Sequence, residues 1–215
     1  MTQLFRRRAA LGVKLSLLGL LGLGTGIGVL LAWRTASYAP RFEPVGQPIP
    51  FSHKHHVGDD GIDCRYCHST VETSAHAGLP STRVCLGCHS QLYADQPILA
   101  PLRRSAATNE PIAWRRVHQL PDFVFFNHGV HVSKGVPCME CHGRVDQMPL
   151  TWREAPLLMQ WCLDCHRNPA PHLHPPQDVV RMDLQPLPPA EGARLARLAG
   201  LADSRRMTDC STCHR

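Results

Sequence analysis

The sequence predicts a loop-rich domain of short helices, turns and coil, preceded by one N-terminal membrane-spanning helix. Three observations lead to this prediction: an uncharged stretch near the N-terminus, a high proline content, and a Cys-x-x-Cys-His motif that occurs five times and uses all ten cysteines. The chain has 215 residues, of which 19 are proline and only 6% are aromatic. Because prolines interrupt helices and are excluded from central strands, we expect short elements and hardly any sheet.

The five Cys-x-x-Cys-His motifs indicate the chemistry of this domain. The pattern is the attachment signature of c-type haem, in which two thiols add to the vinyl groups of one porphyrin and the adjacent histidine binds the iron as proximal ligand. We therefore expect a multihaem cytochrome c with few secondary structures, wrapped around five covalently bound haem c groups. The predicted attachment residues are Cys64, Cys67, Cys85, Cys88, Cys138, Cys141, Cys162, Cys165, Cys210 and Cys213. The predicted proximal ligands are His68, His89, His142, His166 and His214.

Zinc is the alternative for cysteines in such pairs. The 17 residues between Cys67 and Cys85 fit the spacing of a four-cysteine zinc ribbon. However, five pairs cannot be divided evenly among four-cysteine sites. Neither zinc nor disulfide bonding explains why a histidine follows every pair. The sequence therefore favours haem.

The N-terminal segment, residues 1–33, is expected to be a cytoplasmic N-terminus and a transmembrane anchor. No charge occurs from Leu15 to Trp33, which is 19 residues and long enough to cross a bilayer core of about 30 Å. Arg6, Arg7 and Arg8 precede it, so the positive-inside rule places the rest of the chain on the outer side. Because bacteria attach c-type haem there, we expect a single-pass protein of the bacterial inner membrane with a periplasmic haem domain.

A cleaved signal peptide is the alternative interpretation of this segment. The best cleavage site follows Ser37-Tyr38-Ala39, but Pro40 would hinder the peptidase, so we favour a retained anchor. The glycines of residues 22–28 form two overlapping Gly-x-x-x-Gly patterns. Such patterns allow close approach between helices in lipid and predict a packing partner in the membrane.

Residues 34–50 contain four prolines and predict an extended tether. The haem domain should then occupy residues 51–215. Within it, Phe51-Ser52-His53-Lys54-His55-His56 recurs 75 residues later as Phe126-Asn127-His128-Gly129-Val130-His131, each followed by two haem motifs. A fixed period of this kind indicates a duplicated two-haem module. The expected parts are 51–117, 118–170 and a C-terminal segment, 171–215, with the fifth haem.

The repeat also suggests the distal iron ligands. In His-x-x-His the two rings lie one helical turn apart and can serve two neighbouring irons. The predicted distal ligands of four haems are His53, His56, His128 and His131. For the fifth, His118 is the first choice and Met148 the rival, since a thioether would raise the potential of that haem. The histidines expected to face solvent are His55, His76, His172 and His174.

Charge and periodicity add two expectations. Only three of 23 basic residues are lysine, and arginine pairs carboxylates through two parallel hydrogen bonds, which suits haem propionates. The propionates should make the outer domain net negative, so nucleic-acid binding has no support. Near the C-terminus, a helix is expected from about Ala190 to Asp203, with Leu195, Leu198 and Leu201 on one side.

Together with the single anchor and the two modules, several short stretches carry a family resemblance: Pro121-Asp122-Phe123 running into Phe126-Asn127-His128, Cys141-His142-Gly143, and Trp161-Cys162-Leu163-Asp164-Cys165-His166-Arg167. The chain resembles the pentahaem cytochrome c subunit of bacterial alternative complex III, a quinol:electron-acceptor oxidoreductase. The resemblance implies partners: an iron–sulfur subunit, multi-span quinol-binding subunits, a monohaem cytochrome c and often a terminal oxidase. It also implies that the subunit passes electrons from quinol oxidation toward a periplasmic cytochrome c or oxidase.

Three functional classes follow from these observations. The first is a relay, an electron-carrier subunit rather than an enzyme by itself, and the supply of five distal candidates for five irons favours it. The second is a membrane-anchored multihaem quinol dehydrogenase that feeds a periplasmic reductase, which needs a quinol pocket that the sequence does not identify. The third is a multihaem reductase with one open haem. A lysine commonly replaces the histidine at the active haem of that class, whereas every motif here ends in histidine.

Overall fold

The computed structural model describes residues 7–37, 41–201 and 203–214. It divides the chain into two units, Met1–Pro40 and Arg41–Arg215, which are described separately below. Arg6 of the predicted basic cluster and Tyr38, Ala39 and Pro40 of the alternative cleavage site lie outside the described residues.

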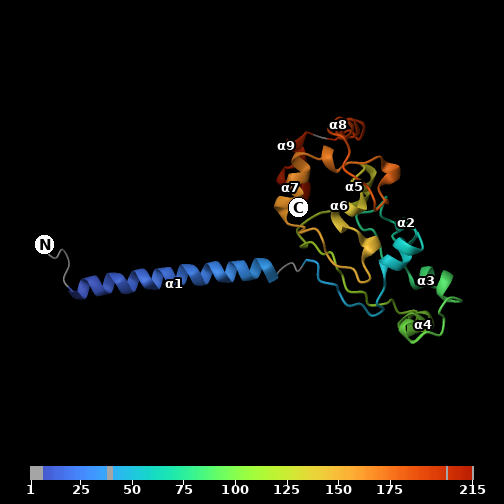
Figure 1. The fold of residues 1–215 in the computed structure, drawn as a ribbon, viewed down its shortest axis with the longest axis horizontal. Coiled ribbons are helices and arrows are strands. Elements are labelled where there is room, and N and C mark those ends of the chain that lie inside the picture. Colours follow the sequence, from blue (N-terminus) through green and yellow to red (C-terminus); the bar gives the residue numbers. More distant parts are fainter. Residues whose placement is uncertain (1–6, 38–40, 202, 215) are drawn as a thin grey trace. The chain divides into compact units, whose positions relative to one another are not determined.

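The first unit contains one helix, α1 (Arg7–Ser37), of 31 residues (Figure 1). Its apolar part, Ala9–Trp33, has 25 residues and is long enough to cross a membrane by length and composition, since 25 residues span roughly 37 Å. No residue of its most apolar window is buried inside the protein. The positions that a side chain would occupy at the glycines of residues 22–28 are open. The helix therefore fits the predicted anchor, and its partner stays a prediction.

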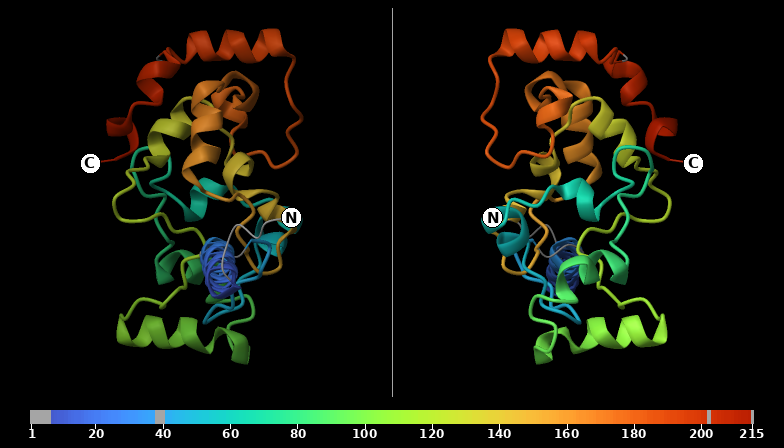
Figure 2. Two further views of the ribbon diagram at one scale, coloured as in Figure 1. Left: turned by 90° about the vertical axis from the view of Figure 1, so that its left-hand side faces the viewer. Right: turned by 90° about the vertical axis from the view of Figure 1, so that its right-hand side faces the viewer.

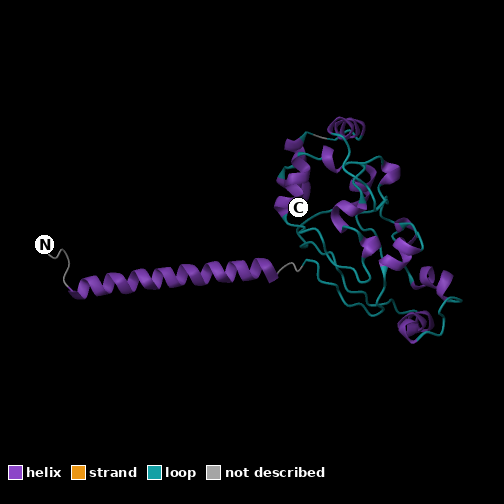
Figure 3. Ribbon diagram, viewed as in Figure 1, coloured by secondary structure: helices purple, strands orange, loops and turns teal. Residues whose placement is uncertain are grey.

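The second unit consists of short helices joined by long loops (Figure 3). No strand occurs among residues 41–201 and 203–214, where one isolated bridge pairs Val124 with His214. Helices α4 and α8 lie at opposite ends of the unit (Figure 2). The prediction of short helices, turns and coil is confirmed. The elements are η1 (Lys54–Asp59), α2 (Cys64–Cys67), α3 (Thr82–His89), η2 (Pro97–Leu99), α4 (Ala100–Thr108), α5 (His128–Ser133), α6 (Cys138–His142), η3 (Val145–Gln147), α7 (Met159–Arg167), η4 (Ala170–His172), η5 (Pro176–Asp178), α8 (Pro189–Leu198), α9 (Ser204–Met207) and α10 (Cys210–Cys213).

Each Cys-x-x-Cys-His motif lies on a short helix. Helices α2, α6 and α10 begin at the first cysteine of a motif, and α3 and α7 end with one or just after it. Aspartates cap two of these helices: Asp63 accepts a hydrogen bond from the Arg65 N–H at 2.8 Å, and Asp209 accepts one from the Ser211 N–H at 2.9 Å. Because residues three apart share one face of a helix, both thiols of a motif point to the same side.

The protein core of this unit is small. One cluster of buried side chains contains Ile49, Leu99 and Leu102, and the other contains Val71, Val132 and Val179. Two clusters of three are little for a unit of this length, because a stable domain buries most of its apolar surface. This agrees with the expectation that porphyrins complete the core.

Residues 41–50, the second part of the predicted tether, are hydrogen bonded to the haem domain. The Phe42 N–H donates to the Arg153 carbonyl at 2.9 Å, and the Val45 N–H donates to the Thr151 carbonyl at 3.1 Å. Gln47 exchanges two hydrogen bonds of 2.8 Å with the backbone of Arg115. The backbone N–H and C=O groups of an extended segment need hydrogen-bond partners from outside it, and here residues 151 and 153 provide some of them.

The helix predicted over residues 190–203 is two helices in the structure, α8 and α9. Helix α8 ends at Leu198, and Gly200 follows with a φ of +60°, a conformation that terminates many helices. Helix α9 then begins after Asp203, whose side chain accepts a hydrogen bond from the Arg205 N–H. Leu195 is buried and Leu198 is 70% exposed, so the leucine side of the helix is only partly covered by the protein's own residues.

A prediction for stability concerns two glycines with positive φ, Gly135 (φ +86°) and Gly61 (φ +68°). A Cβ on Gly135 would collide with the backbone carbonyl of His174, whereas a Cβ on Gly61 would meet open space. Gly61→Ala should therefore lower the free energy of unfolding by about 1 kcal/mol, and Gly135→Ala by roughly 3 kcal/mol, because overpacking adds to the strain. Guanidinium unfolding of both holoproteins measures the difference, and equal losses would contradict the predicted collision.

Candidate functional site

The predicted iron-binding histidines share one hydrogen-bond pattern. Eight of the ten make a hydrogen bond through Nδ1 of 2.8–3.2 Å, seven to a backbone carbonyl and one to a hydroxyl. A neutral imidazole that donates through Nδ1 keeps the Nε2 lone pair for a metal. The eight are His53, His56, His68, His89, His128, His131, His166 and His214. The donor set therefore fits iron.

The residue before each His-x-x-His pair fixes the start of the helical turn. Ser52 accepts a hydrogen bond from the His55 N–H at 3.1 Å, and Asn127 accepts one from the Val130 N–H at 3.1 Å. Serine and asparagine are preferred caps, which explains why these two types occupy this position of the repeat. The turn after Ser52 is a π-helix, η1, whereas the turn after Asn127 is the α-helix α5.

The phenylalanine of each repeat packs against both histidines of its pair. The Phe51 ring is edge-on to His53 at 4.9 Å and stacked on His56 at 4.4 Å between centroids. The Phe126 ring is edge-on to His128 at 4.7 Å and stacked on His131 at 4.5 Å. The phenylalanine is thus a positioning residue that orients two imidazoles from one helical turn.

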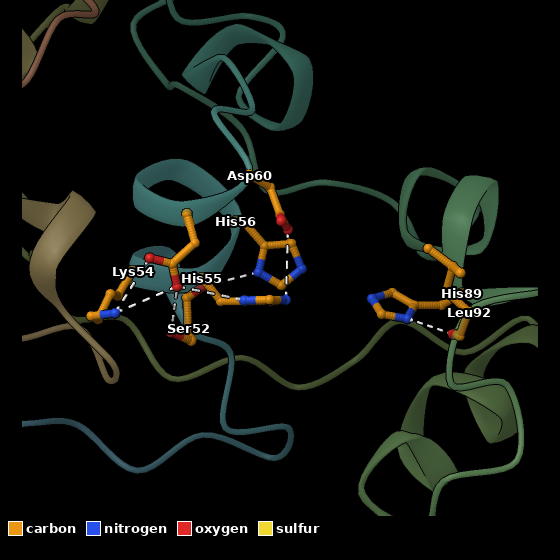
Figure 4. A network of polar contacts seen from close by, with 8 residues as sticks. Ser52, Lys54, His55, His56, Asp60, His89 and Leu92 are labelled. Atoms are coloured by element: carbon orange, nitrogen blue, oxygen red, sulfur yellow. Dashed lines mark hydrogen bonds and ion pairs between the residues drawn. The ribbon is translucent and has the colours of Figure 1, made fainter.

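Three distal candidates face a proximal histidine across a gap. The centroid separations are 6.2 Å for His56 and His89, 6.4 Å for His128 and His142, and 6.0 Å for His131 and His166. Figure 4 shows His56 and His89 on facing segments, with His89 hydrogen bonded to Leu92. Two imidazoles on opposite sides of one metal ion, at ordinary metal–nitrogen distances, have centroids roughly 6 Å apart.

The fourth pair follows from the repeat. His53 corresponds to His128, and the motif that would correspond to Cys138–His142 is Cys64–His68. After burial, the charge of His68 is the largest influence that lowers the pKa of His53, to about 4. The two histidines are therefore neighbours, in agreement with the arrangement in the second module.

The two modules supply contacts to each other's histidines. His53 of the first module bonds the hydroxyl of Thr151 at 2.9 Å, and His128 of the second module bonds the carbonyl of Ala75 at 2.9 Å. The Gly129 N–H donates to the Ser74 carbonyl at 2.9 Å, and a Cβ on Gly129 would press against the Glu72 carbonyl. Each module of the repeat therefore provides a hydrogen-bond partner for a histidine of the other module.

The five motifs neighbour one another in the order second, first, third, fourth, fifth. Burial and then the nearby Cys85 thiol raise the pKa of Cys67, and the neighbouring Cys64 thiol together with burial raises the pKa of Cys138. Cys141 interacts with Cys165, and Cys162 with Cys213. All ten cysteines are free of disulfide bonds, and the two exposed ones, Cys88 and Cys210, belong to the motifs at the two ends of this order.

A hollow beside the first motif and the contacts of the fifth complete the site. The hollow has a volume of about 310 Å³, and its lining includes Val57, Ile62, Cys64, Val180 and Met182.

At the fifth motif, His214 bonds the Phe123 carbonyl at 3.2 Å and its ring stacks on Phe123 at 5.8 Å between centroids. The Phe125 N–H donates to the Cys213 carbonyl at 2.7 Å. Residues 123–125, near the start of the second module, therefore lie against the fifth motif.

The contacts described for the two candidates for the fifth distal ligand are with parts of the unit other than the fifth motif. The His118 ring is edge-on to His142, with centroids 4.3 Å apart, so it lies beside the third motif. Met148 is fully buried, and its carbonyl accepts a hydrogen bond from the Lys54 N–H at 3.1 Å. The ring contact described for His214 is with Phe123. The choice between His118 and Met148 stays a prediction.

The histidines expected to face solvent differ in burial. His55 and His76 are exposed, and His172 is half-buried and bonds the Glu140 carboxylate at 2.9 Å. For His174 the expectation is wrong, because this residue is only 5% exposed. The His174 N–H donates to the Gly135 carbonyl at 2.8 Å. This hydrogen bond holds His174 against the turn that follows α5.

Sequence reasoning missed a cluster of buried polar groups at residues 152 and 153. The Trp152 Nε1 atom and the Arg153 Nε and Nη2 atoms are buried without a hydrogen-bond partner, as is the His118 Nε2 atom. Arginine was expected to bind propionates, but no pattern in the sequence singles out Arg153 among 20 arginines. Thr151 was missed for the same reason, since it lies 98 residues from His53.

Comparison with known proteins agrees with this site. No family model matches the chain. The chain is similar to the multihaem cytochrome c subunit of menaquinone reductase from Nitratidesulfovibrio vulgaris, with 41% identity over 97 residues. The match covers 45% of this chain and 45% of that relative, so the chain spans about half the length of the curated relative it matches. The similarity implies covalently bound haem c and a multihaem cytochrome c fold.

Proposed function

We propose that this protein carries five c-type haems and relays electrons as a subunit of a membrane complex linked to the quinone pool. The pattern of Nδ1 hydrogen bonds carries the proposal, because it prepares eight histidines to bind metal through Nε2. The haems would supply one-electron oxidation and reduction. At four of the five motifs a second histidine would take the remaining iron position, which favours a relay over a reductase.

The chain's own residues hold and orient the cofactors in this proposal. The cysteine pairs would hold each porphyrin on one helix face, and the histidines of the two repeats would supply the second ligand to four of the irons. Phe51 and Phe126 hold the ring planes. Because the motifs neighbour one another in a single unbranched order, the protein has two exposed ends at which partners can exchange electrons.

The finer identification also remains our proposal. The resemblance to the alternative complex III subunit implies iron–sulfur, quinol-binding and monohaem cytochrome partners, with electrons leaving the quinol. The similar protein from N. vulgaris is named as part of a menaquinone reductase, which also links such a subunit to a quinone. Rapid mixing of the purified complex with a reduced menaquinone analogue tests the direction: haem reduction supports quinol oxidation, and its absence contradicts it.

Membrane attachment is a separate prediction. With α1 retained, the protein should stay in the membrane fraction after alkaline carbonate washing, with the haem domain accessible to protease from the periplasmic side. Intact mass should show the N-terminal segment still attached. Release into the wash together with loss of that segment would support the signal-peptide alternative.

Low-temperature electron paramagnetic resonance (EPR) of the oxidised holoprotein, with haem content by pyridine haemochrome, tests the central proposal. Five haems per chain, all low-spin, are expected, because each iron would have two protein ligands. Near-infrared magnetic circular dichroism distinguishes the fifth ligand, since methionine gives its own charge-transfer band. A high-spin haem that binds nitrite or cyanide in the unaltered protein would overturn the relay in favour of an open catalytic site.

A further inference from the structure

Arg153 is a buried cation that forms no ion pair with the residues that the structure describes. Its side chain and backbone together are only 9% exposed, and its Nε and Nη2 atoms have no hydrogen-bond partner. Arginine stays protonated in proteins, so the charge itself is buried. Leaving such a group unpaired costs several kcal/mol, which is why buried charges are normally paired.

The protein groups around Arg153 do not neutralise it. The carboxylate of the adjacent Glu154 lies over Gly143, and no described acidic residue is within ion-pair distance of Arg153. Arg41 is another cation. Burial is the largest influence that lowers the pKa of the Arg153 guanidinium, and the charge of Arg41 lowers it further.

The position of this cluster relates it to one haem motif. The His118 ring lies 4.3 Å from the ring of His142, the proximal histidine of the third motif, and His118 is close enough to feel the charge of Arg153. The His118 Nε2 and Trp152 Nε1 atoms are also buried and unpaired. Glu154, the residue after Arg153, also has its carboxylate over Gly143, directly after the third motif, so this segment lies beside the motif in the middle of the order of five.

We propose that the Arg153 guanidinium binds a propionate carboxylate of the haem attached to Cys138 and Cys141. A carboxylate accepts two parallel hydrogen bonds from Nε and Nη2, the two atoms that lack partners. The inference rests on the proposed function only in requiring a haem at the third motif. As a positioning residue, Arg153 would fix the plane of that haem and favour its reduced state, because a positive charge stabilises the added electron.

The first test is a redox titration of the holoprotein and of Arg153→Gln. The transition of the third motif is identified beforehand as the one that rises in His128→Met, since methionine ligation raises the potential. Arg153→Gln should lower the reduction potential of that one transition by about 59 mV, which is a tenfold change in the equilibrium constant of a one-electron reduction. Arg153→Lys should restore most of the shift, and the exposed Arg194→Gln, whose arginine already pairs with Glu191, should leave every transition unchanged.

The second test does not depend on the Gln variant folding. Haem is labelled with ¹³C at its carboxylates by feeding labelled aminolevulinic acid, and redox-difference infrared spectra are compared for the unaltered protein and Arg153→Lys. A shifted ¹³C-carboxylate band supports the proposal. Labelled bands identical in both proteins overturn it, even if unlabelled carboxylate bands change, because the partner would then be a protein carboxylate. An open haem in the unaltered protein would instead contradict the relay and leave this readout intact.

Discussion

Replacing His131 with alanine is expected to turn one of the five low-spin haems into a high-spin haem that binds cyanide. His131 faces His166 with centroids 6.0 Å apart, and its Nδ1 is held by the Asn127 carbonyl at 2.8 Å, so Nε2 is the atom that would be lost from the iron. EPR and a cyanide titration of the oxidised protein measure the change. The haem content should remain five, because His131 takes no part in covalent attachment.

The matched control for this change is His76→Ala. His76 is exposed and its ring has no described contact with a proximal histidine, so the spin state of every haem should be unchanged. Phe126→Leu is an informative intermediate, since it keeps His131 but removes the ring stacked on it at 4.5 Å. If His131→Ala stays fully low-spin, the assignment of the facing pair is wrong.

Removing the third attachment pair, in Cys138→Ala/Cys141→Ala, is expected to prevent accumulation of the folded protein. A porphyrin buries a few hundred Å² of apolar surface, worth on the order of 10 kcal/mol at about 25 cal/mol per Å². That is comparable with the whole stability of a typical domain. Cys138 also joins separate parts of the unit: its thiol neighbours that of Cys64 in the first module, and its N–H donates to the carbonyl of Val179 in the C-terminal segment at 2.9 Å.

The same substitutions at the fifth motif provide the comparison. Cys210 is exposed, and its motif has one neighbour in the order instead of two. Cys210→Ala/Cys213→Ala should therefore yield a folded protein with four haems and a modest loss of melting temperature. Expression level, haemochrome content and thermal unfolding measure both variants. Equal behaviour of the two variants would show that the middle motif has no special role in stability.

The sequence predicts the nature of the site well because the decisive signals are local. A Cys-x-x-Cys-His motif specifies its own short helix, and the repeated Phe-[Ser/Asn]-His-x-x-His specifies a capped turn with two oriented rings. Ser52 and Asn127 could have been recognised as caps from the same repeat, since serine and asparagine both favour that role. The short-helix, loop-rich fold follows from proline content in the same way.

Contacts between distant segments could not be predicted in this way. His174 is buried because a turn at Gly135 receives its backbone, and residues 41–50 join the domain because residues 151 and 153 offer carbonyls. Arg153 was not found because burial, rather than residue type, distinguishes it. The split of the last predicted helix depends on the φ of Gly200, which composition and periodicity do not reveal.

The exchange of contacts between the two modules has a consequence for how the protein is made. If the haem domain is exported as we propose, its N-terminal half emerges first, and His53 lacks its hydroxyl partner until Thr151 has crossed the membrane. His128, in return, needs the Ala75 carbonyl from the half that is already outside. The first haems can thus be attached covalently before the domain has folded. The order in which the haems are attached therefore need not be the order in which the segments fold. A chain with either half alone would keep the proposed iron ligands of its own motifs, but one of its distal histidines would lack its hydrogen-bond partner.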